Sequence, residues 1–497
     1  MIGGRPDRAE RRGGIGPWLV VIVVALLPAA GLLVLARWAD GQADAVGGEP
    51  APEPPAAAAA DPEPALPTGI LSIRRLPTII SRAISIGDLR ERAQPFLASL
   101  NARSCAAISV DGVDVGTHNP ELAVIPASNQ KLVVAAVALA ELGDDFTYET
   151  TAVAGSEPVD GVVDGDLYLV GGGDPLLSSA WYPTSNLERN PVINPTSLDD
   201  LADQVAADGV RRIRGSVLGD GSRYDDELFA PGWGTGVAGL EGGPYDALLV
   251  NDSRVLGDEL KANDPAEGAA REFQRMLVER GVQVTGAPGT GVAPADAAVL
   301  GSVSSAPLTD VITEMLTSSD NNTAELLVKE IGLSAAGEGT RPAGLEAMRV
   351  ALDEAGINVS EIVLADGSGL SLDNRLTCAA LLGILQDDEL AGPIAAGLAV
   401  AGETGTLSDA FVDHELAGRL LGKTGTLNNP PFNEDPPAVK ALAGYVPVDG
   451  GGAEEFVLIL NGPTISDQSE YRPVWEQLAA VLATYPSGPT PAELGPR

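Results

Sequence analysis

The segment from Ser128 to Gly143 restricts the fold most, because it has the length of a helix and almost no charge. It reads SNQKLVVAAVALAELG, and its charged residues are Lys131 and Glu141. A helix that is apolar on all sides is buried inside a domain. We therefore expect a helix that begins just after Pro126 and lies in the protein core, with a lysine in its first turn.

Ser128 and Lys131 lie three residues apart at the start of this helix, so their side chains share one face. A serine hydroxyl becomes an effective nucleophile when a base takes its proton. A lysine can be that base if burial and nearby positive charge lower its pKa. The spacing predicts a nucleophile and its base. A serine near a helix start, beside a lysine that extends into solvent, would give the same pattern.

A second candidate motif is Ser319-Asp320-Asn321. Alternate residues of an extended segment point to the same side, so Ser319 and Asn321 can face one cleft. There Ser319 could pass on a proton and Asn321 could hold a substrate amide. Serine, aspartate and asparagine are also preferred at helix caps and turns, so a structural role explains the tripeptide equally well.

The third motif, Lys423-Thr424-Gly425-Thr426, lies in an apolar strand pattern. Lys423 and the Thr424 hydroxyl could bind a carboxylate, and Gly425 would let a substrate backbone lie close to the strand. The backbone N–H groups of Ser128 and Thr426 could form an oxyanion hole. A substrate peptide would then lie along the strand edge. An ordinary strand with one lysine that reaches solvent is the alternative.

The composition excludes several classes of function. The net charge of −38 over 497 residues argues against nucleic acid, whose phosphates would be repelled. Cys105 and Cys378 are far apart in sequence, which excludes a C-x-x-C redox or zinc motif, and we favour free thiols over a disulfide. His118 and His414 are too few for a histidine-based metal site. We expect neither a metal nor a cofactor.

Residues 18–36 carry no charge over 19 residues, which is enough to cross the hydrocarbon layer of about 30 Å. Arginines in residues 1–17 predict that this end is a cytoplasmic tail. The run exceeds the apolar region of about 7–15 residues in a cleaved signal peptide, so we expect an uncleaved transmembrane anchor. The rest of the chain would be extracytoplasmic and membrane-anchored, or secreted if the segment is cleaved.

Residues 41–67 consist mainly of proline, alanine and acidic residues, and predict an extended spacer without a core. Residues 68–150 and 302–486 combine helix patterns with strand patterns, whereas 151–301 has mostly short strand patterns and many glycines. We therefore expect one α/β domain in two parts, 68–150 and 302–486. A strand-rich domain is inserted between them at 151–301, and 487–497 is a loose tail.

The three motifs occur in one order along the chain, and two of its five lysines stand where the motifs require one. With this set the chain resembles the low-molecular-mass class C penicillin-binding proteins, the D-alanyl-D-alanine carboxypeptidases and endopeptidases. The resemblance covers about residues 71–485. It includes the stretches GDLYLVGGGDPLL, GDGSRYD, DGSGLSLDNRLT and GYVPVDG, which begin at Gly165, Gly219, Asp366 and Gly444.

The resemblance implies the α/β (α+β) fold of the penicillin-binding-protein and serine β-lactamase-like transpeptidase domain. It also implies a serine-type D-Ala-D-Ala carboxypeptidase that trims peptidoglycan stem peptides through an acyl-enzyme on Ser128. Lys131 would be the base and Ser319 would relay the proton. β-Lactams would be covalent inhibitors. The residues expected to bind the substrate are Asn321, Lys423, Thr424, Gly425 and Thr426.

Three other functions stay open at this point, two of them enzymatic. Cleavage of D-amino cross-links would be the same chemistry with a larger leaving group, so an endopeptidase is compatible with the motifs. A β-lactamase would need fast deacylation, and the sequence has no Glu-x-x-Leu-Asn segment of the class A type. A catalytically silent wall-binding protein would suit a membrane anchor and an acidic surface, but the intact motifs argue against it.

The sequence Gly-x-Thr-Gly-Thr-Leu occurs twice, beginning at Gly402 and Gly422. Its variable position is Glu403 in the first copy and Lys423 in the second. Glu403 would repel a substrate carboxylate, so the first copy cannot do the work of Lys423. The family that the chain resembles has a Gly-Thr-Leu stretch before its Lys-Thr-Gly strand, and residues 405–407 match that stretch. We interpret the first copy as a recurrent loop whose likeness to the second is a coincidence.

Overall fold

The computed structural model describes residues 76–185, 187, 192–234, 236–427, 438–449, 451–462 and 465–494. The chain divides into two compact units, Met1–Leu71 and Ser72–Arg497, and every described residue belongs to the second. The predicted tail, anchor and spacer, residues 1–67, lie outside the described residues. Within the described part of the chain, no helix is both long and apolar enough to cross a membrane.

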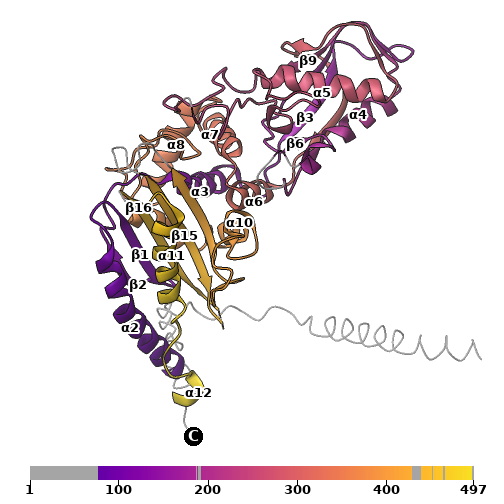
Figure 1. The fold of residues 1–497 in the computed structure, drawn as a ribbon. Helices are drawn as coiled ribbons and strands as arrows, with labels where there is room; N and C mark the ends of the chain where they lie inside the picture. Colours follow the sequence, from indigo (N-terminus) through magenta and orange to yellow (C-terminus); the bar gives the residue numbers. More distant parts are fainter. Residues whose placement is uncertain are drawn as a thin grey trace, which may run out of the picture. The chain divides into compact units, whose positions relative to one another are not determined.

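A six-stranded antiparallel sheet joins the two ends of the second unit. Its strand order is β13-β14-β15-β16-β1-β2. Figure 1 shows the indigo strands from the start of the unit beside the yellow strands from its end. Cys105 of β1 pairs with Ile459 of β16. The strands are β1 (Cys105–Val110), β2 (Val113–His118), β13 (Ala399–Val400), β14 (Leu421–Leu427), β15 (Val439–Pro447) and β16 (Ala453–Asn461).

Both faces of this sheet are covered by helices, which explains the continuous apolar runs in its central strands. In β1, Cys105 and Ala107 contribute to one core, whereas Ala106 and Ile108 contribute to the core on the other face. Successive side chains of a strand point to opposite faces, so burial of both faces requires apolar residues at successive positions. Helices α2 (Leu76–Ser99) and α11 (Gln468–Leu482) cover one face together.

The opposite face of the sheet packs against the helices that carry the candidate site. Side chains from Gln130 to Leu139 are all buried, which confirms the predicted buried helix. These helices are α3 (Gln130–Leu142), α6 (Leu308–Ser318), α7 (Asn321–Ala336), α8 (Arg341–Glu354), α9 (Cys378–Leu385) and α10 (Ala391–Gly397).

A second, five-stranded sheet is built between Glu149 and Ser304, in the region where a strand-rich insertion is predicted. Its order is β11-β9-β5-β3-β12, with β3 antiparallel to both neighbours and the other pairs parallel. The insertion boundaries at 151 and 301 stay a prediction. The strands of this region are β3 (Glu149–Ala154), β4 (Val162–Val163), β5 (Leu167–Val170), β6 (Leu177–Ser178), β7 (Thr196–Ser197), β8 (Arg212–Ile213), β9 (Val217–Asp220), β10 (Gln283–Val284), β11 (Gly289–Thr290) and β12 (Ala298–Ser304).

Two amphipathic helices share a core with this second sheet, α4 (Leu198–Ala207) and α5 (Pro265–Glu279). Each begins at a capping side chain. Ser197 accepts a hydrogen bond from the N–H of Asp200, and Asp264 accepts one from the N–H of Glu267. Local sequence therefore fixes where both helices start.

The preference for free thiols is wrong, because Cys105 and Cys378 form a disulfide. Cys105 is the first residue of β1 and Cys378 the first residue of α9, and both lie in the core between the sheet and the helices. The two positions are 273 residues apart in sequence. They meet only once the sheet and the helices have assembled, so sequence spacing could not show the pairing.

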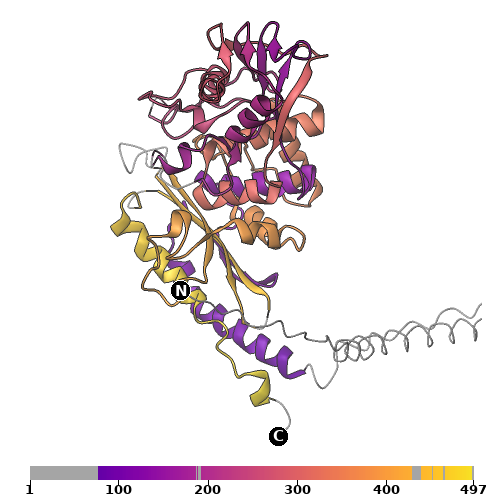
Figure 2. The same ribbon diagram turned by 90° about the vertical axis from the view of Figure 1, so that its right-hand side faces the viewer.

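The structure describes residues 487–494 of the predicted loose tail, and this part is attached to a helix. Ser487 Oγ donates a hydrogen bond to Asp88 of α2, and the N–H of Gly488 donates one to Ser85 of the same helix, both at 3.0 Å. A short helix, α12 (Pro491–Leu494), follows beside α2 (Figure 2). The end of the described chain is therefore attached to the helix with which the described chain begins.

Candidate active site

Ser128 stands in a short 3-10 helix, η1 (Ala127–Asn129), that leads directly into α3. Ala127 has a left-handed φ of 49°, which residues with a side chain rarely adopt, and such strain collects at functional sites. Nζ of Lys131 lies 3.2 Å from Ser128 Oγ. Lys131 is completely buried, so it does not extend into solvent. The two side chains meet as their spacing predicts.

The Lys131 ammonium has three oxygen neighbours, one from its own helix start and two from distant segments of the chain. Besides Ser128, Nζ donates to Asn321 Oδ1 and to the backbone carbonyl of Ser368, both at 2.7 Å. Burial lowers the pKa of Lys131 from 10.5 to about 8. The carboxylates of Asp320, Asp366 and Glu325 act in the opposite direction because they attract its positive charge.

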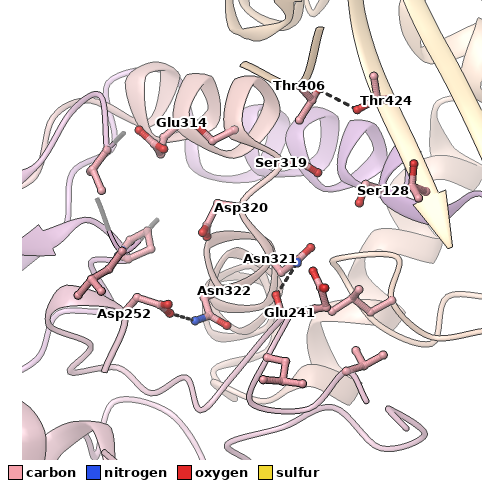
Figure 3. Close-up of a pocket in the computed structure, with 18 of the residues that line it drawn as sticks. Ser128, Glu241, Asp252, Glu314, Ser319, Asp320, Asn321, Asn322, Thr406 and Thr424 are labelled. Atoms are coloured by element: carbon pink, nitrogen blue, oxygen red, sulfur yellow. Dashed lines mark hydrogen bonds between the residues drawn. The ribbon is translucent and has the colours of Figure 1, made fainter. Parts of the chain in front are cut away.

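The Ser319-Asp320-Asn321 tripeptide forms the junction between α6 and α7. Ser319 ends α6 with a left-handed φ of 62°, and Asp320 caps α7 by accepting a hydrogen bond from the N–H of Thr323 at 2.6 Å. The cap and the candidate catalytic role therefore belong to different residues of the same motif. Ser319 and Asn321 both face the candidate site (Figure 3).

Lys423 of β14 contacts Ser319. Its Nζ donates to Ser319 Oγ and to the carbonyl oxygen of Thr424, each at 2.9 Å. The Lys423 side chain is completely buried. Burial, and after it the positive charge of Lys131, lower the pKa of Lys423 well below its ordinary value. Two buried lysines therefore lie close enough to oppose each other's protonation.

Gly425 brings β14 close to the turn that carries the serine. A Cβ at Gly425 would lie 3.0 Å from the carbonyl oxygen of Pro126 and 3.1 Å from the Cβ of Ala127. The glycine was predicted to make room for a substrate backbone, whereas here its missing side chain makes room for η1. Thr426 follows with an exposed side chain. The oxyanion hole of the Ser128 and Thr426 N–H groups stays a prediction.

The predicted residues converge on one cavity of about 800 Å³. It is shown in Figure 3, where Ser128, Ser319 and Thr424 lie side by side. The buried lysines are not part of its lining, but each contacts a serine that is. Within the described ranges, no cluster of histidine, cysteine, aspartate or glutamate could hold a metal ion. The motif residues that line the cavity are Ser128, Ser319, Asp320, Asn321, Thr424 and Thr426.

Glu325 supports the candidate site, and no role was assigned to it from the sequence. It is buried in α7 and accepts hydrogen bonds from the N–H groups of Gly367 at 3.1 Å and Ser368 at 2.7 Å. These bonds fix the loop whose Ser368 carbonyl accepts from Lys131. Burial, and then the charge of Asp366, raise the pKa of Glu325 to about 7. The available sequence signal was weak, because α7 also carries Lys329 and Glu330, so a glutamate at 325 does not stand out.

Two more site residues lie in segments to which no role was assigned. The carbonyl oxygen of Glu241 accepts a hydrogen bond from Asn321 Nδ2 at 2.6 Å. Thr406, in the first copy of the repeated sequence, lines the cavity, and its Oγ1 accepts a hydrogen bond from Thr424 Oγ1 at 2.8 Å. Glu403 is exposed and lies outside the cavity lining. The first copy is therefore not a second site, but it contributes a residue to the one site.

Comparison with known proteins identifies the family of the chain. The family model of the D-Ala-D-Ala carboxypeptidase 3 (S13) family matches residues 103–255 and 246–485. The chain belongs to this family. The family match confirms the predicted family. It also confirms the predicted activity, that of a D-Ala-D-Ala carboxypeptidase, which is a serine hydrolase.

Curated relatives and solved structures agree with this assignment. Carboxypeptidase DacB of Mycolicibacterium smegmatis is 31% identical, over 96% of this chain and 98% of that protein. The D-alanyl-D-alanine carboxypeptidase of Actinomadura sp. is 32% identical, over 68% of this chain and 73% of that protein. Penicillin binding protein 4 of Haemophilus influenzae has a TM-score of 0.62 at 21% identity, covering 80% of this chain and 98% of that one. This likeness confirms the predicted α+β penicillin-binding-protein fold.

Proposed function

We propose that this carboxypeptidase removes the terminal D-Ala of peptidoglycan stem peptides through an acyl-enzyme on Ser128. The observation that carries the proposal is the arrangement of acceptors around Lys131. A neutral lysine has two N–H donors and one lone pair. The oxygens of Asn321 and Ser368 can only accept, so they take both N–H groups. The lone pair is then left for the Ser128 hydroxyl, 3.2 Å away.

The pKa of Lys131 makes this neutral form accessible. With a pKa of about 8, roughly a tenth of the lysines are neutral at pH 7. Lys131 then takes the hydroxyl proton while Ser128 Oγ attacks the carbonyl carbon of the penultimate D-Ala. The N–H groups of Ser128 and Thr426 would stabilise the oxyanion. Asn321 Nδ2 has a second hydrogen, besides the one that Glu241 accepts, with which to hold a substrate carbonyl.

The remaining steps use the pair of Ser319 and Lys423. Ser319 Oγ, 2.9 Å from Lys423 Nζ, would relay a proton to the amine of the leaving D-Ala. Lys423 and the hydroxyls of Thr424 and Thr426 would hold the terminal carboxylate, and the negative charge of that carboxylate favours protonation of Lys423. Water then hydrolyses the ester on Ser128. A β-lactam, which presents a reactive carbonyl and a carboxylate, would acylate the same serine and inhibit the enzyme.

The proposal is tested by the release of D-Ala from a synthetic stem pentapeptide, measured by mass spectrometry. Wild type should release one D-Ala per peptide, and Ser128→Ala should release none. Ser99→Ala is the control for loss of a serine hydroxyl elsewhere, because Ser99 is the last residue of α2 and lies outside the cavity lining, and it should retain full activity. Release of D-Ala by Ser128→Ala at the wild-type rate would refute the proposed nucleophile.

The same assay separates carboxypeptidase from endopeptidase activity. A cross-linked muropeptide dimer presents the same scissile D-Ala carbonyl with a larger leaving group. The cavity also extends to Tyr471 and Trp475 of α11, beyond the motif residues, which supports access for such a substrate. We propose carboxypeptidase action as the main activity. A dimer cleaved faster than the pentapeptide would reverse that order.

We also propose that residues 18–36 anchor the enzyme in the membrane and that 41–67 hold the catalytic unit away from it. The substrate lies outside the cytoplasmic membrane, which supports an extracytoplasmic location. Full-length protein should sediment with membranes after a carbonate wash, whereas a chain that begins at Ser72 should not. A secreted product whose mass lacks the first 36 residues would show cleavage and refute the anchor.

A further inference from the structure

The first copy of the repeated sequence places a second hydroxyl against the proposed carboxylate site. Thr406 and Thr424 both line the cavity, and their Oγ1 atoms are 2.8 Å apart (Figure 3). Both side chains are half-buried. The proposed carboxypeptidase reaction does not use the Thr406 hydroxyl, so the contact of this hydroxyl with Thr424 is not accounted for by the catalytic steps.

The backbone around Thr406 is firmly held, so its hydroxyl is presented at a fixed position. Thr406 is the middle residue of a 3-10 helix, η4 (Gly405–Leu407), and the Leu407 side chain is completely buried. Gly405 has a φ of 53°, and a Cβ there would lie 2.1 Å from the carbonyl oxygen of Thr317 in α6. The turn therefore packs directly on the end of the helix that carries Ser319.

The same turn is connected to β14 through the sheet. Ala399 of β13, shortly before the turn, pairs with Gly422 of β14. The N–H of Val400 also donates to Thr404 Oγ1 at 2.9 Å, which ties the strand to the turn. The turn that carries Thr406 and the strand that carries Thr424 are thus connected through β13, which pairs with β14.

The chemistry of two hydroxyl groups determines what the contact can do. A hydroxyl has one hydrogen to donate and two lone pairs to accept with, whereas a carboxylate only accepts. When Thr424 turns its hydrogen from Thr406 to a substrate carboxylate, its own lone pair faces Thr406, which must then be the donor. The two hydroxyls form a chain whose hydrogens all point toward the carboxylate. Donors in such a chain polarise one another and strengthen the final bond.

We propose that Thr406 is a positioning residue that sets the direction of the Thr424 hydroxyl and so favours substrates with a free terminal carboxylate. The proposal rests on the proposed function, in which Lys423 and Thr424 bind that carboxylate. Thr406 itself does not touch the substrate. Its effect should therefore appear in the preference for a carboxylate and not in the chemistry at Ser128.

The test compares an acyl-D-Ala-D-Ala peptide with its C-terminal amide, using the full-length protein in mild detergent. The variants are Thr406→Val, which keeps the shape and removes the hydroxyl, and Thr406→Ser, which restores the hydroxyl. Each variant is measured with both substrates, at high enzyme concentration for the slower amide. The ratio of the two kcat/KM values within one variant does not depend on how much of that variant is folded.

Thr406→Val should lower kcat/KM for the free acid about tenfold, the upper end of what the loss of one hydrogen bond between uncharged groups costs. Its kcat/KM for the amide should change less than about twofold, and Thr406→Ser should return the ratio to within about threefold of wild type. In a Thr424→Val background, Thr406→Val should have no further effect, because the group that it orients is gone.

Several results would overturn the proposal. Equal losses for acid and amide in Thr406→Val, or no recovery in Thr406→Ser, would show a structural role. Independent, additive effects of Thr406→Val and Thr424→Val would show that the two hydroxyls do not act as a chain. If Thr424→Val and Lys423→Ala also leave the acid-to-amide ratio unchanged, the carboxylate site itself is misplaced and the proposed function fails with it. If only those two variants change the ratio, the inference about Thr406 fails alone.

Discussion

Lys131 can act as a base only in its neutral form, so the rate of acylation should follow its titration. Its pKa is lowered to about 8, so the neutral fraction grows with pH, reaches one half near pH 8 and is nearly complete about one pH unit higher. We predict that the acylation rate constant with a penicillin rises about tenfold per pH unit below 8 and levels off above 8. Stopped-flow or quenched labelling between pH 6 and 9.5 measures it. A rate independent of pH over this range would contradict a neutral lysine base.

Glu325 offers a control for the assignment of that titration to Lys131. Its negative charge raises the pKa of Lys131, so Glu325→Gln should move the midpoint of the pH–rate profile to lower pH. Glutamine keeps an oxygen that can accept from the N–H of Ser368, as the carboxylate does at 2.7 Å. An unchanged midpoint in this variant would assign the titration to another group.

At the scale of single residues, the sequence predicted the pairs that local geometry determines and missed those made by distant segments. Ser128 and Lys131 are three positions apart on one helix, so their meeting follows from helix geometry. Ser368 acts through its backbone carbonyl, which no residue type reveals. Thr406 was set aside because Glu403 distinguishes the two repeated sequences, although the shared threonine is the residue that reaches the cavity.

At the scale of elements, α7 holds Asn321 in place and is itself held by Lys329. Nζ of Lys329 lies 2.6 Å from Asp225 Oδ1, donates to the carbonyl of Glu227 at 2.7 Å and stands 5.1 Å from the centre of the Tyr245 ring. Lys329 is completely buried. These contacts join α7 to residues 225–245. That segment lies between β9 and α7 in the sequence.

We predict that Lys329→Met lowers the free energy of unfolding by about 2–3 kcal/mol. Removal of one partner from a fully buried ion pair costs about 3–5 kcal/mol, and the cost is smaller here because Asp225 is 34% exposed and can be rehydrated. Urea unfolding followed by fluorescence measures it. Arg349→Met is the matched control, since the Arg349–Glu346 pair of α8 is exposed and its loss should change nothing measurable. Equal effects of both variants would contradict the anchoring role of Lys329.

The elements themselves were predicted unevenly. The buried α3 could be predicted because a helix without a polar face must be covered on all sides. The strand that pairs with β1 could not be predicted. Its partner β16 lies about 350 residues later in the chain, and several other apolar strand patterns could equally have paired with β1. For the same reason the disulfide between β1 and α9 was missed.

At the scale of the whole molecule, stability should depend on pH through a buried carboxyl far from the motifs. Glu454 is the second residue of β16 and is 1% exposed, and its Oε2 has no hydrogen-bond partner among the described residues. Burial raises the pKa of Glu454 to about 9, and the neighbouring Glu455 acts in the same direction, against Arg419. The folded protein therefore prefers the protonated form of a carboxyl that is ionised in the unfolded chain above about pH 4.5.

The sign of the effect follows from this difference in pKa. The contribution of protonated Glu454 is complete below pH 4.5 and is lost as the pH rises toward about 9. We predict that Glu454→Gln, which cannot ionise, matches wild type at pH 4 and is more stable than wild type at pH 8. Denaturant unfolding at the two pH values measures it, with unchanged penicillin acylation as the check on the active site. A variant less stable than wild type at pH 8 would contradict the raised pKa.

Every step of the proposed reaction depends on a single acylable serine at position 128, and peptide mapping of the penicillin adduct tests this serine most directly. Wild-type protein would be labelled with a penicillin, digested and analysed by mass spectrometry beside Ser128→Ala. We predict one penicilloyl group per chain, on the peptide that contains Ser128, lost slowly because water reaches the ester inefficiently, and none in the variant. An adduct on another residue, rapid turnover of the drug as in a β-lactamase, or folded wild type that takes no label would contradict Ser128 as the nucleophile of a carboxypeptidase.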